Sequence, residues 1–151
     1  MPRRGAPVAQ QPSPAPVPAG IGRRLASLLY EALLGFAIVF VAGFLFHGAT
    51  SGRLAGPARH FFQLYLLAVL GLYFVWCWHR GGQTLPMKTW KLRLVSAGGG
   101  PVSISRATAR YLLACLSAAL AGAGFAWALF DRDRQFLHDR LAGTRIAPSG
   151  E

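Results

Sequence analysis

Apolar residues of this chain gather in three long blocks that are separated by polar segments. The blocks run from Leu25 to Phe46, from Phe61 to Trp78 and from Ala107 to Phe130. As a helix, the first block would be about 33 Å long, enough to cross a hydrocarbon core of roughly 30 Å. The pattern therefore predicts an all-α membrane protein with three hydrophobic helical segments.

The third block differs from the other two because Arg110 interrupts it and small residues are frequent in it. By default we expect one spanning helix, in which pairs such as Ala118 and Gly122 favour close packing against another helix in lipid. In the alternative, the block breaks near Gly122 to Gly124 and is re-entrant or interfacial. About 24 residues are too few for two full spans, so the two halves would be short.

The segments outside the blocks predict two tails and a short strand. Residues 1–20 hold six of the ten prolines and predict a disordered tail, and residues 148–151 form a second tail. Trp90 to Leu94 alternates between polar and apolar residues, which is typical of a strand. We expect an extended pairing between residues 91–96 and 143–148. The membrane domain then covers residues 22–147.

Composition and charge support a membrane setting. The chain is 53% hydrophobic and 14% charged, whereas soluble domains carry about 25% charged residues. Its 16 Lys and Arg against 5 Asp and Glu would also suit nucleic acid, but these cations flank the apolar blocks. No nucleic-acid-binding signature accompanies them. We therefore expect a lipid bilayer as the partner and no nucleic acid.

The distribution of positive charge predicts the orientation. The amino-terminal flank carries four Lys and Arg, the first loop two, the second loop six when Arg110 is counted with it, and the carboxyl-terminal flank four. Three spanning blocks would place ten cations on one side and six on the other, whereas a returning third block would place fourteen against two. Because cations favour the cytoplasmic side, the amino terminus is cytoplasmic in both arrangements.

Glu31 is the charged residue of the first block, and a carboxylate in a bilayer costs a few kcal/mol, roughly, to insert. Either it has a function or a specific internal partner, or its side chain extends to the near interface. Arg24 lies seven residues earlier on the same face, but helical side chains lean toward the amino terminus, away from Glu31. We expect Arg24 to meet Asp139; otherwise it is an ordinary flanking cation.

Other chemical signals are weak. His138 precedes Asp139, and we interpret the two as a surface pair whose imidazole titrates near neutral pH rather than as a catalytic dyad. Cys77 and Cys115 both lie within apolar blocks and act as small apolar side chains. The chain has no nucleophile elbow, phosphate-binding glycine loop or zinc-ligand spacing. We expect no enzyme activity, no cofactor and no metal.

Three segments carry a family resemblance, in this order along the chain. They are Arg24 to Glu31, Gly82 to Lys88 with the following Trp90 to Val95, and His138 to Thr144. Together they resemble the RDD family of small bacterial membrane proteins, over residues 22–147. The resemblance assigns the family's arginine and two acids to three functional positions and adds five supporting ones: Arg24, Glu31 and Asp139, then His138, Thr144, Gln83, Thr84 and Lys88.

The chain departs from the family pattern at two positions. Glu31 stands where the family usually has Asp, which keeps the charge and adds a methylene. Pro86 stands where Gly is usual. Because proline fixes φ and removes a backbone donor, we expect an altered turn there.

The resemblance implies a multi-pass protein of the bacterial cytoplasmic membrane that transports ions or small solutes. Glu31 would be the carboxylate that responds to ions or protons, with Arg24 and Asp139 as a structural or gating pair. A chain this small would form a homo-oligomer or join a membrane partner to enclose a pathway. The alternative is an interaction or assembly protein without transport, whose basic cytoplasmic face binds anionic lipid or a partner.

Overall fold

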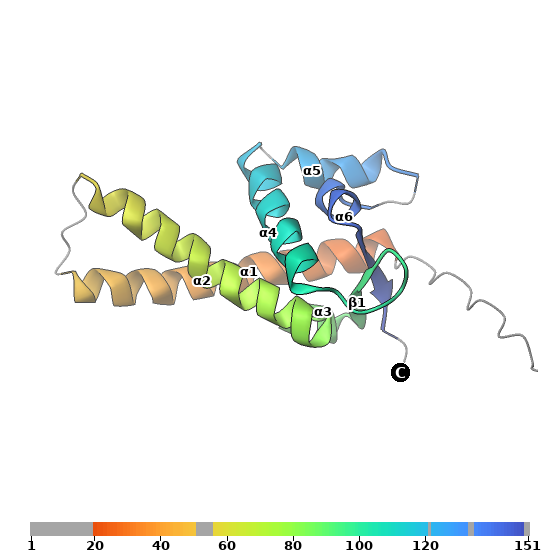
Figure 1. Cartoon of the computed structure of the whole chain (residues 1–151), viewed down its shortest axis with the longest axis horizontal. Coiled ribbons are helices and arrows are strands. Elements are labelled where there is room, and N and C mark those ends of the chain that lie inside the picture. Colours follow the sequence, from red (N-terminus) through yellow and green to blue (C-terminus); the bar gives the residue numbers. More distant parts are fainter. Residues whose placement is uncertain (1–19, 51–55, 121, 133–134, 150–151) are drawn as a thin grey trace, which may run out of the picture.

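The structure is a computed structural model that describes residues 20–50, 56–120, 122–132 and 135–149, so the predicted tail over residues 1–19 lies outside the described residues. Two long helices, α1 (Ile21–Ala49) and α2 (Ala58–Gly81), run alongside each other in opposite directions (Figure 1). The remaining elements gather where α1 begins and α2 ends: α3 (Leu85–Thr89), β1 (Leu92–Ser96), α4 (Ile104–Ala119), α5 (Ala123–Ala126), η1 (Trp127–Leu129), α6 (Leu137–Leu141) and β2 (Thr144–Pro148).

Both α1 and α2 are long and apolar enough to cross a membrane. Their most apolar windows have mean hydropathies of 2.2 and 1.8. Only 6% and 11% of the residues in those windows are buried, so the apolar side chains face outward rather than into a protein core. This exposure is what lipid favours, because lipid tails solvate apolar side chains as well as a core does. The first two predicted segments are confirmed, with bounds a few residues wider.

The third apolar block is not one helix. Its first part is α4, whose 16 residues extend only about 24 Å. The helix ends at Ala119, and Gly122 follows with φ +77°, a backbone conformation that glycine adopts without a side-chain clash. Its amide donates to the Ser117 carbonyl at 2.9 Å. Three spanning helices are therefore not confirmed. The described residues contain the break near Gly122 to Gly124 that the alternative requires, and the re-entrant or interfacial position of the block stays a prediction.

The predicted pairing of extended segments is confirmed. β1 and β2 form an antiparallel pair that runs from Leu92 opposite Pro148 to Ser96 opposite Thr144. Gly82 at the end of α2 helps to seat this pair: its φ is +65°, and a Cβ there would lie 2.7 Å from the Leu94 carbonyl oxygen. The pair brings the Gly-Gln-Thr segment and the His-Asp segment to the same end of the molecule.

Pro86 is compatible with the start of α3. The Thr84 hydroxyl caps this helix by accepting from the Met87 amide at 3.3 Å. Pro86 lies in the first turn, where backbone amides have no carbonyl partner within the helix. Its missing N–H therefore removes no helical hydrogen bond.

Helices α1 and α2 together form a helical hairpin. The buried apolar core is small and lies at one end of this hairpin, and we call that end the core end. Its buried members are Trp78, Met87, Leu92, Leu94, Val102, Ala107, Tyr111, Ala128, Phe136 and Ile146. The other end of the hairpin, residues 40–49 of α1 and 58–66 of α2, extends beyond the other elements (Figure 1) and is called the distal arm. Large apolar side chains are exposed there, including Phe44 at 74%.

Candidate functional site

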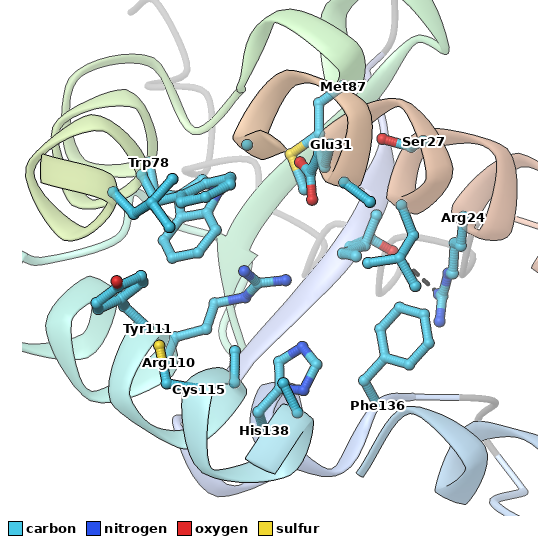
Figure 2. Close-up of a pocket in the computed structure, with 18 of the residues that line it drawn as sticks. Arg24, Ser27, Glu31, Trp78, Met87, Arg110, Tyr111, Cys115, Phe136 and His138 are labelled. Atoms are coloured by element: carbon cyan, nitrogen blue, oxygen red, sulfur yellow. Dashed lines mark hydrogen bonds between the residues drawn. The ribbon is translucent and has the colours of Figure 1, made fainter. Parts of the chain in front are cut away.

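A cavity of about 490 Å³ lies between α1, α2 and α4 at the core end (Figure 2). Helix α2 packs against both α1 and α4, whereas α1 and α4 make few direct contacts with each other. That spacing leaves the cavity, which His138 and Ile146 close from the carboxyl-terminal side. Most of its wall is apolar, but five polar or charged side chains face it at one end: Arg24, Ser27, Glu31, Arg110 and His138.

Glu31 has a specific internal partner. The Thr84 hydroxyl donates to Glu31 Oε1 at 2.6 Å across 53 residues of sequence. Thr84 is fully buried, and it reaches α1 because it caps α3, which packs on α1. The carboxylate also lies within electrostatic range of Arg110 and Asp139. The structure therefore favours the hypothesis of an internal partner for Glu31 over a side chain that extends to the near interface.

Asp139 forms a buried ion pair with Arg110. Arg110 Nε donates to Asp139 Oδ1 at 2.6 Å, and the two side chains are 5% and 1% exposed. The Arg110 guanidinium also stacks on the Trp78 ring, 4.1 Å from its centroid. Because the pair is buried in a region of low dielectric, loss of either partner would leave the other charge unpaired at a high cost in stability. Sequence reasoning noted Arg110 only as an interruption of the third block; that interruption was the available signal.

Arg24 is 2% exposed and lies close to the same acid. Its Nη2 donates to the Ile146 carbonyl on β2 at 3.1 Å, and it lies within electrostatic range of Asp139. The interpretation of Arg24 as an ordinary flanking cation is wrong, since such a residue would be exposed. A direct Arg24–Asp139 ion pair stays a prediction.

His138 and Asp139 are buried rather than paired at the surface, so that interpretation is wrong. His138 is 2% exposed, its ring stacks on Phe136, and its Nε2 lies 3.8 Å from Asp139 Oδ1. Burial lowers the pKa of the His138 imidazole to about 4, although the Asp139 carboxylate acts in the opposite direction. The imidazole is thus neutral at neutral pH and does not titrate there.

The supporting residues divide into two groups. Thr144 donates to the Asp139 carbonyl at 3.3 Å, and Gln83 Nε2 donates to the Leu92 carbonyl at 2.7 Å, so both hold backbone around the cavity. Lys88 is exposed and does not line the cavity. We call the buried polar set the polar cluster: Arg24, Glu31, Thr84, Arg110, His138 and Asp139.

The polar cluster is close to electrically balanced. Two guanidinium groups face two carboxylates, and the imidazole is neutral. Asp139 and Arg110 satisfy each other directly, whereas the hydroxyl that binds Glu31 is neutral. Among the acids of the cluster, Asp139 thus has a cation as its direct partner and Glu31 has a neutral hydroxyl.

Comparison with known families gives one match. The model of the RDD family matches residues 18–143, which contain both long helices and every member of the polar cluster. The chain matches no curated protein and no solved structure.

Proposed function

The chain belongs to the RDD family, and on that premise we propose that it is an integral membrane protein that moves an ion or a small solute. Glu31 is the group whose charge changes in the process. The setting is the cytoplasmic membrane of a bacterium. Two apolar helices and the family match support membrane insertion.

In the proposed topology, α1 and α2 cross the bilayer and the third block returns to its starting side. The break at Gly122 and the packing of α5 and α6 near α4 support a return. Both ends of the chain then share the cytoplasm with fourteen of the sixteen Lys and Arg. This is the stronger of the two charge asymmetries, and cations favour the cytoplasmic side.

The proposal rests mainly on the position of Glu31. This carboxylate belongs to α1, one of the two candidate membrane helices, and it lines the cavity between α1, α2 and α4. Its Oε1 is bound by the neutral Thr84 hydroxyl. Figure 2 shows the carboxylate directed into the same space as the Arg110 guanidinium. In surroundings of low dielectric, a carboxylate whose direct hydrogen-bond partner is a neutral hydroxyl is costly to keep charged, so we propose that it takes up a proton or a cation. Loss and recovery of that ion are the elementary steps of coupled transport.

A complete pathway requires more than one chain in this proposal. The described elements include only two helices that can span a bilayer. A second copy of this chain, or another membrane protein, would supply the remaining walls. The exposed apolar faces of α1 and α2 offer the surface for that association.

Proton flux in proteoliposomes tests the proposal. The chain is reconstituted with a pH-sensitive dye inside, and a sodium or potassium gradient is imposed. We expect a gradient-driven pH change that Glu31→Gln abolishes and Glu31→Asp partly retains. Asp131→Asn is the matched control, because Asp131 pairs with Arg140 outside the cavity and should leave flux unchanged. Equal flux in wild type and Glu31→Gln would refute the role of Glu31.

A second candidate function rests on the basic surface of the core end. Among the described residues of this end, eight cations are exposed: Arg23, Arg80, Lys88, Lys91, Arg93, Arg106, Arg132 and Arg140. In this alternative the polar cluster only holds the fold, and the cations bind anionic lipid or an acidic partner. Glu31→Gln would then change stability or assembly, and Lys91→Ala with Arg93→Ala would weaken the preference for anionic vesicles.

A further inference from the structure

Two buried hydrogen-bond donors in the cavity wall have no partner among the described residues. They are the Ser27 hydroxyl on α1 and the Trp78 indole N–H on α2, and both residues are 3% exposed. Both line the same cavity, on opposite helices (Figure 2). Buried donors in folded proteins almost always have an acceptor. The cavity is therefore suited to a ligand that brings hydrogen-bond acceptors to this end.

The surrounding charges also suit an oxygen-rich group. The Arg110 guanidinium lies against the Trp78 ring and faces the cavity. Arg24 lines the same end. A carboxylate or phosphate head can accept hydrogen bonds from both open donors, Ser27 and Trp78, which a charged amine cannot, so an oxygen-rich head fits this end better than an amine does.

The rest of the cavity is apolar and opens on an apolar surface. Along α1 it extends from Ser27 to Val39, which corresponds to about 18 Å of helix. Phe36, Leu67 and Ala118 line this part and are themselves exposed on the outer surface. Because these positions lie on or beside the two apolar helices, the opening faces lipid tails when the helices span the bilayer.

We propose that the cavity binds a single-chain amphipath taken laterally from the bilayer. Its head accepts hydrogen bonds from Ser27 and Trp78, and its acyl chain lies between α1 and α4 toward Val39. A fatty acid and a lysophospholipid share this chemistry. Transfer of the chain from lipid into the cavity changes its surroundings little, so the head contacts supply the selectivity. The inference goes beyond ion or solute movement, because binding requires no transport.

Quenching of Trp78 fluorescence tests this proposal. The chain carries Trp76→Phe, Trp90→Phe and Trp127→Phe, so that Trp78 alone reports. It is placed in phosphatidylcholine and phosphatidylglycerol vesicles and titrated with dibromostearic acid. We expect quenching that saturates at a low mole fraction of the probe. Ser27→Ala should raise the half-saturating mole fraction about fivefold, the effect of one net hydrogen bond.

Two matched variants locate the bound chain. Ala118→Phe fills the apolar part of the cavity and should remove the saturable quenching. Ala119→Phe adds the same group at the next, exposed position outside the cavity and should leave the quenching unchanged. Quenching that rises in proportion to probe, and equally in both variants, would show ordinary contact with bilayer lipid and overturn the proposal.

Competition identifies the head. Displacement by unlabelled palmitate assigns a carboxylate, and displacement by lysophosphatidylglycerol alone assigns a phosphate. Equal displacement by hexadecylamine, whose head only donates hydrogen bonds when charged, would overturn the acceptor requirement. No ion gradient is imposed in this assay, so its failure and the failure of the transport proposal are separate results.

Discussion

The distal arm and the core end of this molecule expose and bury opposite kinds of side chain. In the distal arm the large apolar side chains are outside: Phe40 is 66% exposed and Phe44 is 74% exposed. At the core end the charged side chains are inside: Arg24 is 2% exposed and Asp139 is 1% exposed. A soluble protein of the same length would bury the first set and expose the second.

The difference follows from the solvent that each region meets. Lipid solvates apolar side chains as well as a protein core does, so burial of Phe44 would gain little. Lipid offers nothing to polar groups, so these must find partners within the protein. The core end supplies those partners from six elements, and its stability should depend on polar contacts more than on apolar area.

The largest expected effect is on stability, and it comes from a comparison of two arginines that are each paired with an aspartate. Arg110 is 5% exposed and pairs with Asp139, whereas Arg140 is 57% exposed and pairs with Asp131. Arg110→Gln leaves Asp139 buried without its cation and should lower the free energy of unfolding by about 3–5 kcal/mol. Arg140→Gln should cost less, about 1–2 kcal/mol, because the Asp131 side chain is 4% exposed but keeps a hydrogen bond from the Gln135 amide. Equilibrium unfolding in mixed micelles measures both, and equal losses would contradict the contrast.

The next effect is a dependence of stability on pH. The folded-state pKa of His138 is about 4, below its ordinary value of 6.5. The unfolded chain therefore takes up a proton first as the pH falls, and stability that is fully present above pH 6.5 is lost down to about pH 4. The loss amounts to about 3 kcal/mol. In His138→Asn the unfolding free energy should fall less over this range; parallel curves for the two proteins would refute the assignment.

A smaller loss of stability is expected from substitution of two threonines, Thr84 just before α3 and Thr89 at its end. Thr84→Val removes both the helix cap and the donor to Glu31, and should cost about 1–2 kcal/mol. Thr89→Val removes an exposed hydroxyl that bonds within the same helix, and should cost below about 0.5 kcal/mol. Thermal unfolding in micelles compares them. Similar losses would mean that the Thr84–Glu31 contact contributes nothing of its own.

Sequence alone predicted the distal arm better than the core end. Apolar blocks such as Phe61 to Trp78 identify a membrane helix by a local property, the run of apolar residues, so no knowledge of contacts was needed. The strand pair was also predictable, because Trp90 to Leu94 alternates and a second extended segment follows the His-Asp motif.

The contacts of the polar cluster were harder to predict. Asp139 meets Arg110 across 29 residues and Glu31 meets Thr84 across 53 residues. Such pairs depend on how α3, α4 and α6 fold back onto the hairpin, and no local pattern encodes that. The burial of His138 was not predicted for the same reason. A His beside an Asp in a polar segment is expected at the surface unless the packing around it is known.

The proposed topology places the polar cluster toward the cytoplasmic face of the bilayer, the carboxyl-terminal end in the cytoplasm and the tip of the distal arm on the opposite side. Labelling of single cysteines tests it most directly. His60→Cys and Ser149→Cys are made in a chain with Cys77→Ala and Cys115→Ala, and intact cells are treated with an impermeant maleimide. We predict that His60→Cys reacts at once and that Ser149→Cys reacts only after the cells are opened. Reaction of Ser149→Cys in intact cells would mean that the third block spans the bilayer, and would contradict the account.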